Sequence, residues 1–298
     1  MPVDPEESPK PRSTAAKKRA SSPTKAASAT KAAPTAPAAK RDLLNPLVAS
    51  VTAFFPCYND EHSIGTMVEK VEKALEASGA DFEIIVINDA SPDNSAAVLD
   101  ALQSEHPKLR VITHNRNRGY GGALRSGFEA ATKDWVFYTD GDGQYDPSEI
   151  TRLIELAQTD VDVVQGYKIG RSDSLMRKVV GRTYHHGVAI LFNLEVQDVD
   201  CDFRLMRRDK LDQIELVNNS GAITMELCRK LQETGARWVQ TGVHHYNREY
   251  GASQFFTPSR VGKTLWDLAR MWTQLIPGEA LRRRRARKLA ATTPTRER

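Results

Sequence analysis

The chain has 298 residues, enough for one large domain or two small ones, and carries 42 Lys and Arg against 38 Asp and Glu. The positive charge is concentrated at the ends, with nine basic and three acidic residues in 1–41 and eight and two in 279–298. The part between is therefore net negative, and it shows no nucleic-acid-binding motif, so no nucleic-acid partner is expected. No apolar run approaches the ~20 residues that a membrane-spanning helix needs.

Composition divides the chain into four segments. Residues 1–46 form a basic tail rich in Ala, Pro and Lys, which we expect to be disordered because it has little to bury. A folded domain is expected over 47–258, an amphipathic helix over 259–278 and a second basic, disordered tail over 279–298. The three cysteines are far apart and odd in number, which favours reduced thiols and a cytoplasmic setting.

Short apolar runs alternate with segments of helical spacing from residue 51 onward. The expected strands cover 51–55, 83–87, 109–113, 135–139 and 161–165, and the expected helices cover 66–77, 95–102, 122–132 and 148–158. This alternation over short turns predicts an α/β domain with a mainly parallel sheet covered on both faces. Ligands of such sheets bind beyond the carboxyl ends of the strands.

Two acids, Asp140 and Asp142, follow directly after the apolar run 135–139. Paired carboxylates at a strand end suit a hard divalent cation such as Mg²⁺ or Mn²⁺, which prefers oxygen ligands and commonly also binds phosphate. The pattern therefore suggests an enzyme that handles a nucleoside diphosphate. The alternative is a solvated acidic turn, since Asp and Gly are frequent in turns. Asp146, before Pro147, is predicted to cap the next helix rather than to bind metal.

Four sequence blocks occur in one order: FPCYNDE at 55–61, VINDASPDN at 86–94, NRNRGYGGALRSGF at 115–128 and DGD at 140–142. Together they resemble glycosyltransferase family 2. Three further features resemble the polyprenyl-phosphate sugar synthases, such as dolichyl-phosphate mannosyltransferase: DGQ at 142–144, DFR at 202–204 and NREYGAS at 247–253. The resemblance implies a single glycosyltransferase A-type α/β domain with a mainly parallel nucleotide-binding sheet.

The resemblance also implies roles for the residues at the strand ends. The donor-binding residues would be Pro56, Tyr58, Asn59, Glu61, Asp89, Gly119, Asp140 and Gly141. Asp89 is expected to hydrogen-bond the ribose or base, and Asp140, Asp142 and Gln144 to hold Mg²⁺ or Mn²⁺ as a Lewis acid on the diphosphate. Gly119, Gly121 and Gly122 would let the backbone pass close to the ligand, or would simply permit a tight turn.

Arginines after the fifth expected strand suggest a second anion at the site. The resemblance assigns an acceptor phosphate to Arg182 and Arg248, and less strongly to Arg177 and Arg204, so that Asp142, Arg182 and Arg248 form the expected catalytic set. Arg171, Arg177 and Lys178 would otherwise form a solvated helix face. A phosphate acceptor is already anionic and needs no general base, unlike a hydroxyl.

Two acids leave the acceptor open. Glu226 would be a general base, a partner for an arginine or a surface residue, and the structural roles are favoured. Asp202 stands where the similar synthases usually have Gly, which would alter the field beside the acceptor arginines.

Helical spacing after residue 260 forms an apolar stripe, and a basic cluster follows it. The stripe comprises Val261, Leu265, Leu268, Trp272 and Leu275 and is widened by Trp266, Ala269, Met271 and Ile276. This pattern favours a peripheral membrane anchor. The alternative is a helix packed on the domain, and a membrane-embedded partner protein would serve the same purpose.

The expected function is inverting, metal-dependent transfer of mannose or glucose to a polyprenyl phosphate at the cytoplasmic membrane face. The donor would be GDP-mannose or UDP-glucose. Three alternatives stay open: transfer to a hydroxyl of a glycan or glycolipid, a non-catalytic nucleotide-sugar-binding protein, and nucleic-acid binding through the basic tails.

Overall fold

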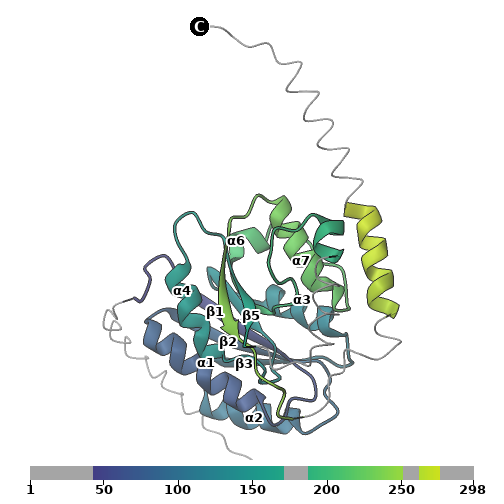
Figure 1. The fold of residues 1–298 in the computed structure, drawn as a ribbon. Helices are drawn as coiled ribbons and strands as arrows, with labels where there is room; N and C mark the ends of the chain where they lie inside the picture. Colours follow the sequence, from purple (N-terminus) through teal and green to yellow (C-terminus); the bar gives the residue numbers. More distant parts are fainter. Residues whose placement is uncertain (1–42, 171–186, 251–261, 276–298) are drawn as a thin grey trace, which may run out of the picture. The chain divides into compact units, whose positions relative to one another are not determined.

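Seven strands form one sheet in the order β3-β2-β1-β4-β6-β5-β7 in the computed structural model, which describes residues 43–170, 187–250 and 262–275 (Figure 1). Their bounds are Ser50–Cys57 for β1, Asp81–Asn88 for β2, Leu109–Thr113 for β3, Trp135–Thr139 for β4, Val163–Ile169 for β5, Phe203–Arg207 for β6 and Trp238–His244 for β7. Among the strands of the described residues, β6 alone pairs antiparallel with its neighbours, so the prediction of a mainly parallel sheet is confirmed. Five strands agree with those expected; β6 and β7 were not predicted.

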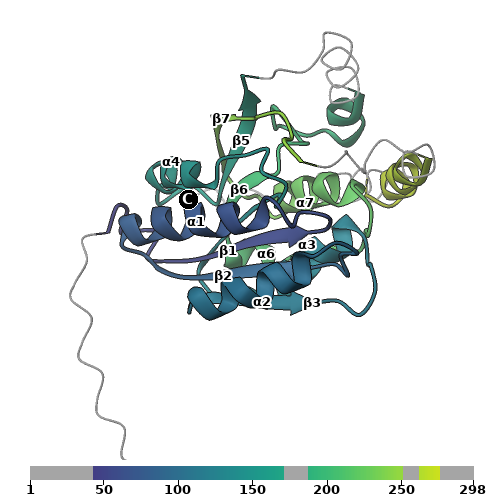
Figure 2. The same cartoon turned by 90° about the horizontal axis from the view of Figure 1, so that it is seen from below.

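Helices cover both faces of the sheet (Figure 2). One face carries α1 (Ile64–Ser78), α2 (Ser95–Glu105) and α4 (Ile150–Leu156), and the other carries α3 (Tyr120–Ala130), α6 (Arg208–Leu211) and α7 (Ala222–Glu233). Neighbouring residues of β1 enter different cores: Phe55 packs with α1, and Phe54 packs against the α3 side. Burial on both sides explains why these strands have continuous apolar sequences rather than alternating ones.

A short 3₁₀ helix, η1 (Pro147–Glu149), leads into α4 and begins as predicted. The side chain of Asp146 accepts a hydrogen bond from the Ser148 backbone N at 3.1 Å, and Pro147 occupies the first helical position. Such a cap satisfies a backbone N–H that has no partner within the helix.

A third core joins α7 to two further helices, over residues 187–192 and 262–275. Leu268 and Met271 of the last helix pack against it, and Trp272 Nε1 donates to the Leu191 carbonyl oxygen at 3.1 Å. Both views show the 262–275 helix, drawn in yellow, beside α7. One side of this helix therefore packs on the domain, as the alternative to a membrane anchor predicted. Leu265 and Trp266, on the other hand, remain exposed. None of the helices in the described parts of the chain is long and apolar enough to cross a membrane.

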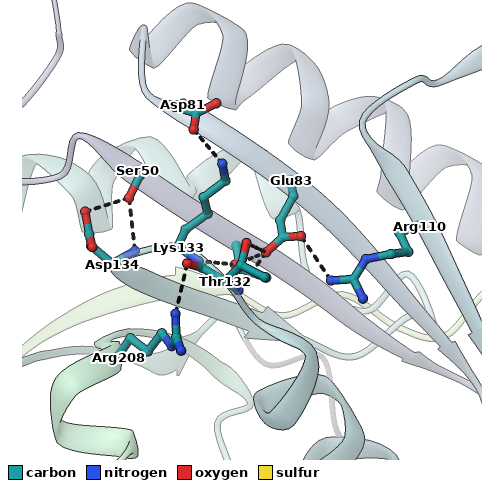
Figure 3. A network of polar contacts seen from close by, with 9 residues as sticks. Ser50, Asp81, Glu83, Arg110, Thr132, Lys133, Asp134 and Arg208 are labelled. Carbon is teal, nitrogen blue, oxygen red and sulfur yellow. Dashed lines mark hydrogen bonds and ion pairs between the residues drawn. The ribbon is translucent and has the colours of Figure 1, made fainter.

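A polar network ties together the amino ends of the central strands, at the edge opposite the predicted site (Figure 3). Glu83 of β2 lies at its centre. Its carboxylate accepts hydrogen bonds from Thr52 Oγ1 at 2.7 Å, Thr132 N at 2.8 Å and Arg110 Nη2 at 3.1 Å. Figure 3 also shows Lys133 directed at Asp81. The network joins β1, β2 and β3 to the turn before β4.

Glu83→Gln should lower the free energy of unfolding by about 1–2 kcal/mol at neutral pH, because hydrogen bonds to a charged acceptor are lost. Burial alone would raise the pKa of Glu83, but the bonds from Thr132 and Thr52 outweigh it and lower the pKa below its ordinary value. The ionised form therefore adds stability above pH ~4.3, and that contribution is lost as the pH falls through the lowered pKa. Urea unfolding at pH 7 and pH 3 should show the variant and the wild type converging in acid. Glu69→Gln, on the exposed side of α1, should show no such pH-dependent difference.

Candidate active site

The carboxyl ends of β1, β2 and β4 meet because these strands are parallel neighbours. The loops after β1 and β4 touch, since Ser63 Oγ donates to the Gly141 carbonyl oxygen at 2.7 Å. A Cβ at Gly141 would lie 2.7 Å from the Pro56 carbonyl oxygen, so this close approach requires glycine. The structure thereby brings together the predicted residues of the two loops.

Four carboxylates gather at this edge: Asp60, Asp140, Asp142 and Asp202. Burial raises the pKa of Asp140 well above its ordinary value, and the charges of Asp202 and Asp142 raise it further. Burial also raises the pKa of Asp60 to about 7, where the Tyr58 backbone hydrogen bond opposes the shift and the charge of Asp142 adds to it. Like charges held together away from water favour a cation between them.

The residues fit a divalent metal that is shared with a substrate. In residues 43–170, 187–250 and 262–275, no three Asp, Glu, His or Cys side chains converge as a self-sufficient metal site. Mg²⁺ typically uses one or two carboxylates together with waters and substrate phosphates. Asp140 and Asp142 would supply two such carboxylates. Tyr120 OH donates to Asp140 Oδ1 at 2.7 Å and so fixes the orientation of that carboxylate.

Arg248 lies directly against the acidic cluster and forms an ion pair with Asp142 through Nη2 and Oδ2. Burial would lower the pKa of Arg248, but the charge of Asp142, followed by those of Asp60 and Asp140, raises it. The other oxygen of Asp142, Oδ1, accepts from the Gln144 backbone N at 3.0 Å. Both oxygens of the predicted ligand Asp142 are therefore engaged.

The segment after β7 is hydrogen-bonded to the loop that carries Asp142. Tyr246 N donates to the Gln144 carbonyl oxygen at 2.8 Å, and Gln144 Nε2 donates to the Tyr246 carbonyl oxygen at 3.1 Å. Tyr145 and His245 form an antiparallel bridge between them. The Gln144 amide thus binds the backbone two residues before Arg248, and its predicted metal contact stays a prediction.

Asp89 is placed at the predicted strand end, but its carboxylate faces the protein. It is buried and accepts from His114 Nδ1 at 2.6 Å, Arg118 N at 2.8 Å and Gly119 N at 2.9 Å. The expected hydrogen bonds to ribose or base therefore compete with three protein donors. In this geometry Asp89 positions the 117–119 turn at the start of α3.

At two glycines of that turn, Gly119 and Gly121, an added side chain would meet protein backbone. A Cβ at Gly119 would lie 2.6 Å from the Asn219 carbonyl oxygen, and one at Gly121 would lie 2.3 Å from that of Asn218. Gly119 also has a φ of 80°, which disfavours any side chain. The space at Cβ of Gly119 and Gly121 is thus taken by the 218–219 backbone, and that at Gly122 by the Arg118 side chain. The expectation that these glycines let the backbone pass close to a ligand stays a prediction.

The loop after β1 is joined to the loop after β2. Asn59 has a φ of 62° and its backbone N donates to Ser91 Oγ at 2.8 Å. Glu61 accepts from the Asn94 backbone N at 2.6 Å. Asn59 and Glu61 thus shape the loops, and Tyr58 lies beside them, half-buried. Left-handed backbone at a non-glycine residue is costly and is common at functional sites.

A model of the family described as glycosyl transferase family 2 matches residues 52–215, more than half of the chain. The chain belongs to glycosyltransferase family 2. Its predicted family and its glycosyltransferase A-type α/β fold are thereby confirmed, and at the level of the family it is a nucleotide-sugar glycosyltransferase.

Solved structures with this fold have low sequence identity to the family 2 chain. Glucosyl-3-phosphoglycerate synthase from Mycobacterium tuberculosis in complex with UDP is 17% identical, with a TM-score of 0.60 over 77% of this chain and 83% of that one. Mannosyl-3-phosphoglycerate synthase from Rubrobacter xylanophilus is 17% identical, with a TM-score of 0.54 over 84% and 78%. Mannosyltransferase PcManGT from Pyrobaculum calidifontis, in complex with GDP-Man and Mn²⁺, is 17% identical with a TM-score of 0.50 over 67% of this chain. The chain spans 58% of PcManGT's length.

On the predicted acceptor side of this glycosyltransferase, Arg204 is a correction. Arg204 belongs to β6, a strand within the sheet, and its side chain is 0% exposed. Its donors bind Asp202 Oδ1 at 2.9 Å, Gln165 Oε1 at 3.1 Å, the Tyr138 hydroxyl and the Val199 carbonyl oxygen. A guanidinium enclosed in this way cannot reach an acceptor phosphate, and Asp202 serves as its buried counter-ion.

Of the other arginines predicted to bind the acceptor phosphate, the structure describes Arg248 but not Arg177 or Arg182. Arg248 pairs with Asp142, a residue predicted to hold the metal on the donor diphosphate. Arg177 and Arg182, together with Arg171 and Lys178, lie outside the residues that the structure describes, so their roles stay predictions.

Glu226 has a structural role in the glycosyltransferase. It is 1% exposed on α7 and accepts from Val217 N at 3.0 Å, Asn218 N at 2.9 Å and Lys230 Nζ at 2.6 Å. The favoured structural interpretation thus fits its contacts. Through this loop Glu226 supports the backbone that packs against Gly119 and Gly121.

Sequence reasoning missed Asp60 and Tyr120 at this site. Asp60 lies within the block that resembles the family, and its position directly before Glu61 at a strand end was the available signal. Tyr120 gave none, because its contact with Asp140 joins residues 20 positions apart.

Proposed function

We propose that this family 2 enzyme transfers mannose or glucose from a nucleoside-diphosphate sugar to a polyprenyl phosphate, with inversion at the sugar carbon. The observation that carries the proposal is the arrangement of Asp140, Asp142 and Arg248 at the carboxyl edge of the sheet. It combines ligands for a cation with a guanidinium able to bind phosphate.

Asp140 and Asp142 would hold Mg²⁺ or Mn²⁺, which when bound neutralises the charge that develops on the departing nucleoside diphosphate. Tyr120 fixes Asp140, and the contact between Ser63 and Gly141 fixes the loop between the two acids. The complexes of PcManGT with GDP-Man and Mn²⁺ and of the mycobacterial synthase with UDP support a donor of this type.

The contacts of Glu226 support a phosphate acceptor rather than a hydroxyl acceptor. A hydroxyl acceptor benefits from a general base, and Glu226 is the carboxylate that the sequence offers for that role. Because its oxygens bind backbone N–H groups and Lys230, it supports a loop instead. An anionic phosphate oxygen can attack the sugar carbon without losing a proton first.

The test is sugar transfer by the purified full chain with Mn²⁺, with and without chelator. Labelled GDP-mannose and UDP-glucose are each offered with polyprenyl phosphate, 3-phosphoglycerate or a glycan hydroxyl acceptor. We expect chelator-sensitive label in the lipid extract from one donor. Label in phosphoglycerate, the product type for which two structural neighbours are named, would replace the lipid acceptor. Label in the glycan would favour the hydroxyl alternative, and donor binding without any transfer would overturn catalysis.

The enzyme would meet its lipid at a membrane surface through apolar side chains from two separate helices. Ile190 is 81% exposed on the 187–192 helix, and Trp266 is 71% exposed on the 262–275 helix. The hydrogen bond from Trp272 to Leu191 joins the two helices, and the exposed Lys263 and Arg270 add positive charge. Exposed Trp and Leu beside basic residues suit the surface of an anionic bilayer.

Trp266→Ser should weaken binding to vesicles that contain anionic lipid by about tenfold, because a large apolar side chain no longer leaves water. Co-sedimentation with phosphatidylserine vesicles measures the effect. The matched control is Leu47→Ser, an exposed apolar residue near the opposite edge of the sheet, which should bind as the wild type does. Equal binding by the wild type, Trp266→Ser and Leu47→Ser would show that Trp266 does not contact the membrane and would contradict this proposal.

A further inference from the structure

Both carboxylate oxygens of Asp142 have protein partners. Its Oδ1 accepts from the Gln144 backbone and its Oδ2 pairs with Arg248 Nη2. Its side chain is only 8% exposed, so little of the carboxylate is open to solvent beside these partners. A cation that binds Asp142 through Oδ2 must therefore displace Arg248.

Arg248 also acts on more than one acid. The charges that raise its pKa are those of Asp142, Asp60 and Asp140, which are members of the buried acidic cluster. Three carboxylates brought together without a counter-charge would repel one another. In this structure Arg248 supplies positive charge at the place where the proposed metal would supply it.

The backbone that carries Arg248 is held independently of this ion pair. The reciprocal bonds between Gln144 and Tyr246 and the bridge from Tyr145 to His245 anchor the segment two residues earlier. Rotation of the Arg248 side chain alone can therefore change its partner while the segment stays in place.

We propose that Arg248 is an exchangeable counter-ion, which neutralises Asp142 in the metal-free enzyme and moves to a substrate phosphate when the divalent cation binds. The inference rests on the proposed function, because it uses Asp142 as a metal ligand. It makes metal alone a weak ligand and couples metal binding to the arrival of the diphosphate, which receives the released guanidinium. Arg248 thus suppresses loading of the site with metal in the absence of donor.

The test measures Mn²⁺ binding rather than turnover. Free Mn²⁺ is followed by electron paramagnetic resonance at constant ionic strength, first with protein alone and then with saturating GDP or UDP. Arg248→Ala should bind Mn²⁺ alone about tenfold more tightly than the wild type, because the competing cation is gone. The gain in affinity on adding nucleotide should shrink in the same variant. Arg248→Lys, which keeps the charge, should remain closer to the wild type.

Arg116→Ala is the matched control, since it removes one positive charge from an exposed position in the loop after β3. It should leave Mn²⁺ affinity near the wild-type value. If Arg248→Ala binds Mn²⁺ alone no more tightly than Arg116→Ala, the counter-ion role is wrong while the metal site stands. If the wild type binds no Mn²⁺ even with either nucleotide, the proposed metal site is wrong and the inference fails with it.

A second readout is thermal unfolding, measured first without metal and then with Mn²⁺. Metal-free Arg248→Ala should unfold at a lower temperature than Arg116→Ala, because the acidic cluster loses its counter-charge, and Mn²⁺ should restore more of the lost stability in that variant. An unfolding temperature unchanged by Arg248→Ala would contradict the proposal.

Discussion

Asp142→Ala is expected to reduce the turnover of sugar transfer by on the order of a thousandfold while the protein stays folded, since the metal that stabilises the leaving diphosphate loses a ligand. The side chain lies at the carboxyl edge of the sheet, outside the apolar cores, so its removal leaves no cavity within them. Steady-state transfer assays and thermal unfolding, run on the same preparation, separate the two effects.

Asp146→Asn is the control for the Asp142 variant. Asp146 lies four residues further on, caps the following helix and pairs with Lys70. Because Asn caps a helix about as well as Asp, the replacement loses mainly the surface ion pair, so it should cost less than about 1 kcal/mol and leave turnover largely intact. Wild-type turnover in Asp142→Ala would remove the metal hypothesis.

Arg204→Ala should produce a large loss of stability, about 3–5 kcal/mol, because it leaves Asp202 and neighbouring polar groups buried without their partner. Chemical denaturation followed by circular dichroism measures the loss. Arg207→Ala, on the same strand, should cost less because its side chain is 26% exposed and rests on the Trp135 ring.

The Arg204 experiment also separates the sequence-based role from the structural one. A phosphate-binding arginine would give a stable variant with a raised acceptor KM. A well-folded Arg204→Ala or Arg204→Lys enzyme with only that defect would show that the guanidinium reaches the acceptor, contrary to its enclosed position.

The strands predicted from sequence were those with continuous apolar runs, because burial on both faces leaves that signature. β6 carries arginines at positions 204 and 207, which indicate exposure when taken singly. The charge of Arg204 is neutralised by Asp202, and its other N–H groups bind Tyr138 and Gln165. These partners come from three places along the chain. Local sequence could not reveal that such a charged strand lies inside the sheet.

The same limit applies at the candidate site. Positions at strand ends were predictable, because parallel strands bring their carboxyl ends to one edge. The direction in which a side chain points was not. Asp89 faces His114 and the 118–119 backbone, 25 to 30 residues along the chain, and Arg248 reaches Asp142 across 106 residues. These contacts depend on the arrangement of the whole sheet.

The sheet order has a consequence for how the chain folds during synthesis. β1, β2, β3 and β4 are complete by Thr139, but β6, which pairs with the open side of β4, begins only at Phe203. Until then β4, whose residues are all buried in the folded protein, is an unprotected edge, the kind of surface on which nascent chains aggregate. This stage of folding should depend strongly on chaperones, and a ribosome-stalled chain that ends before residue 200 should be their preferred substrate.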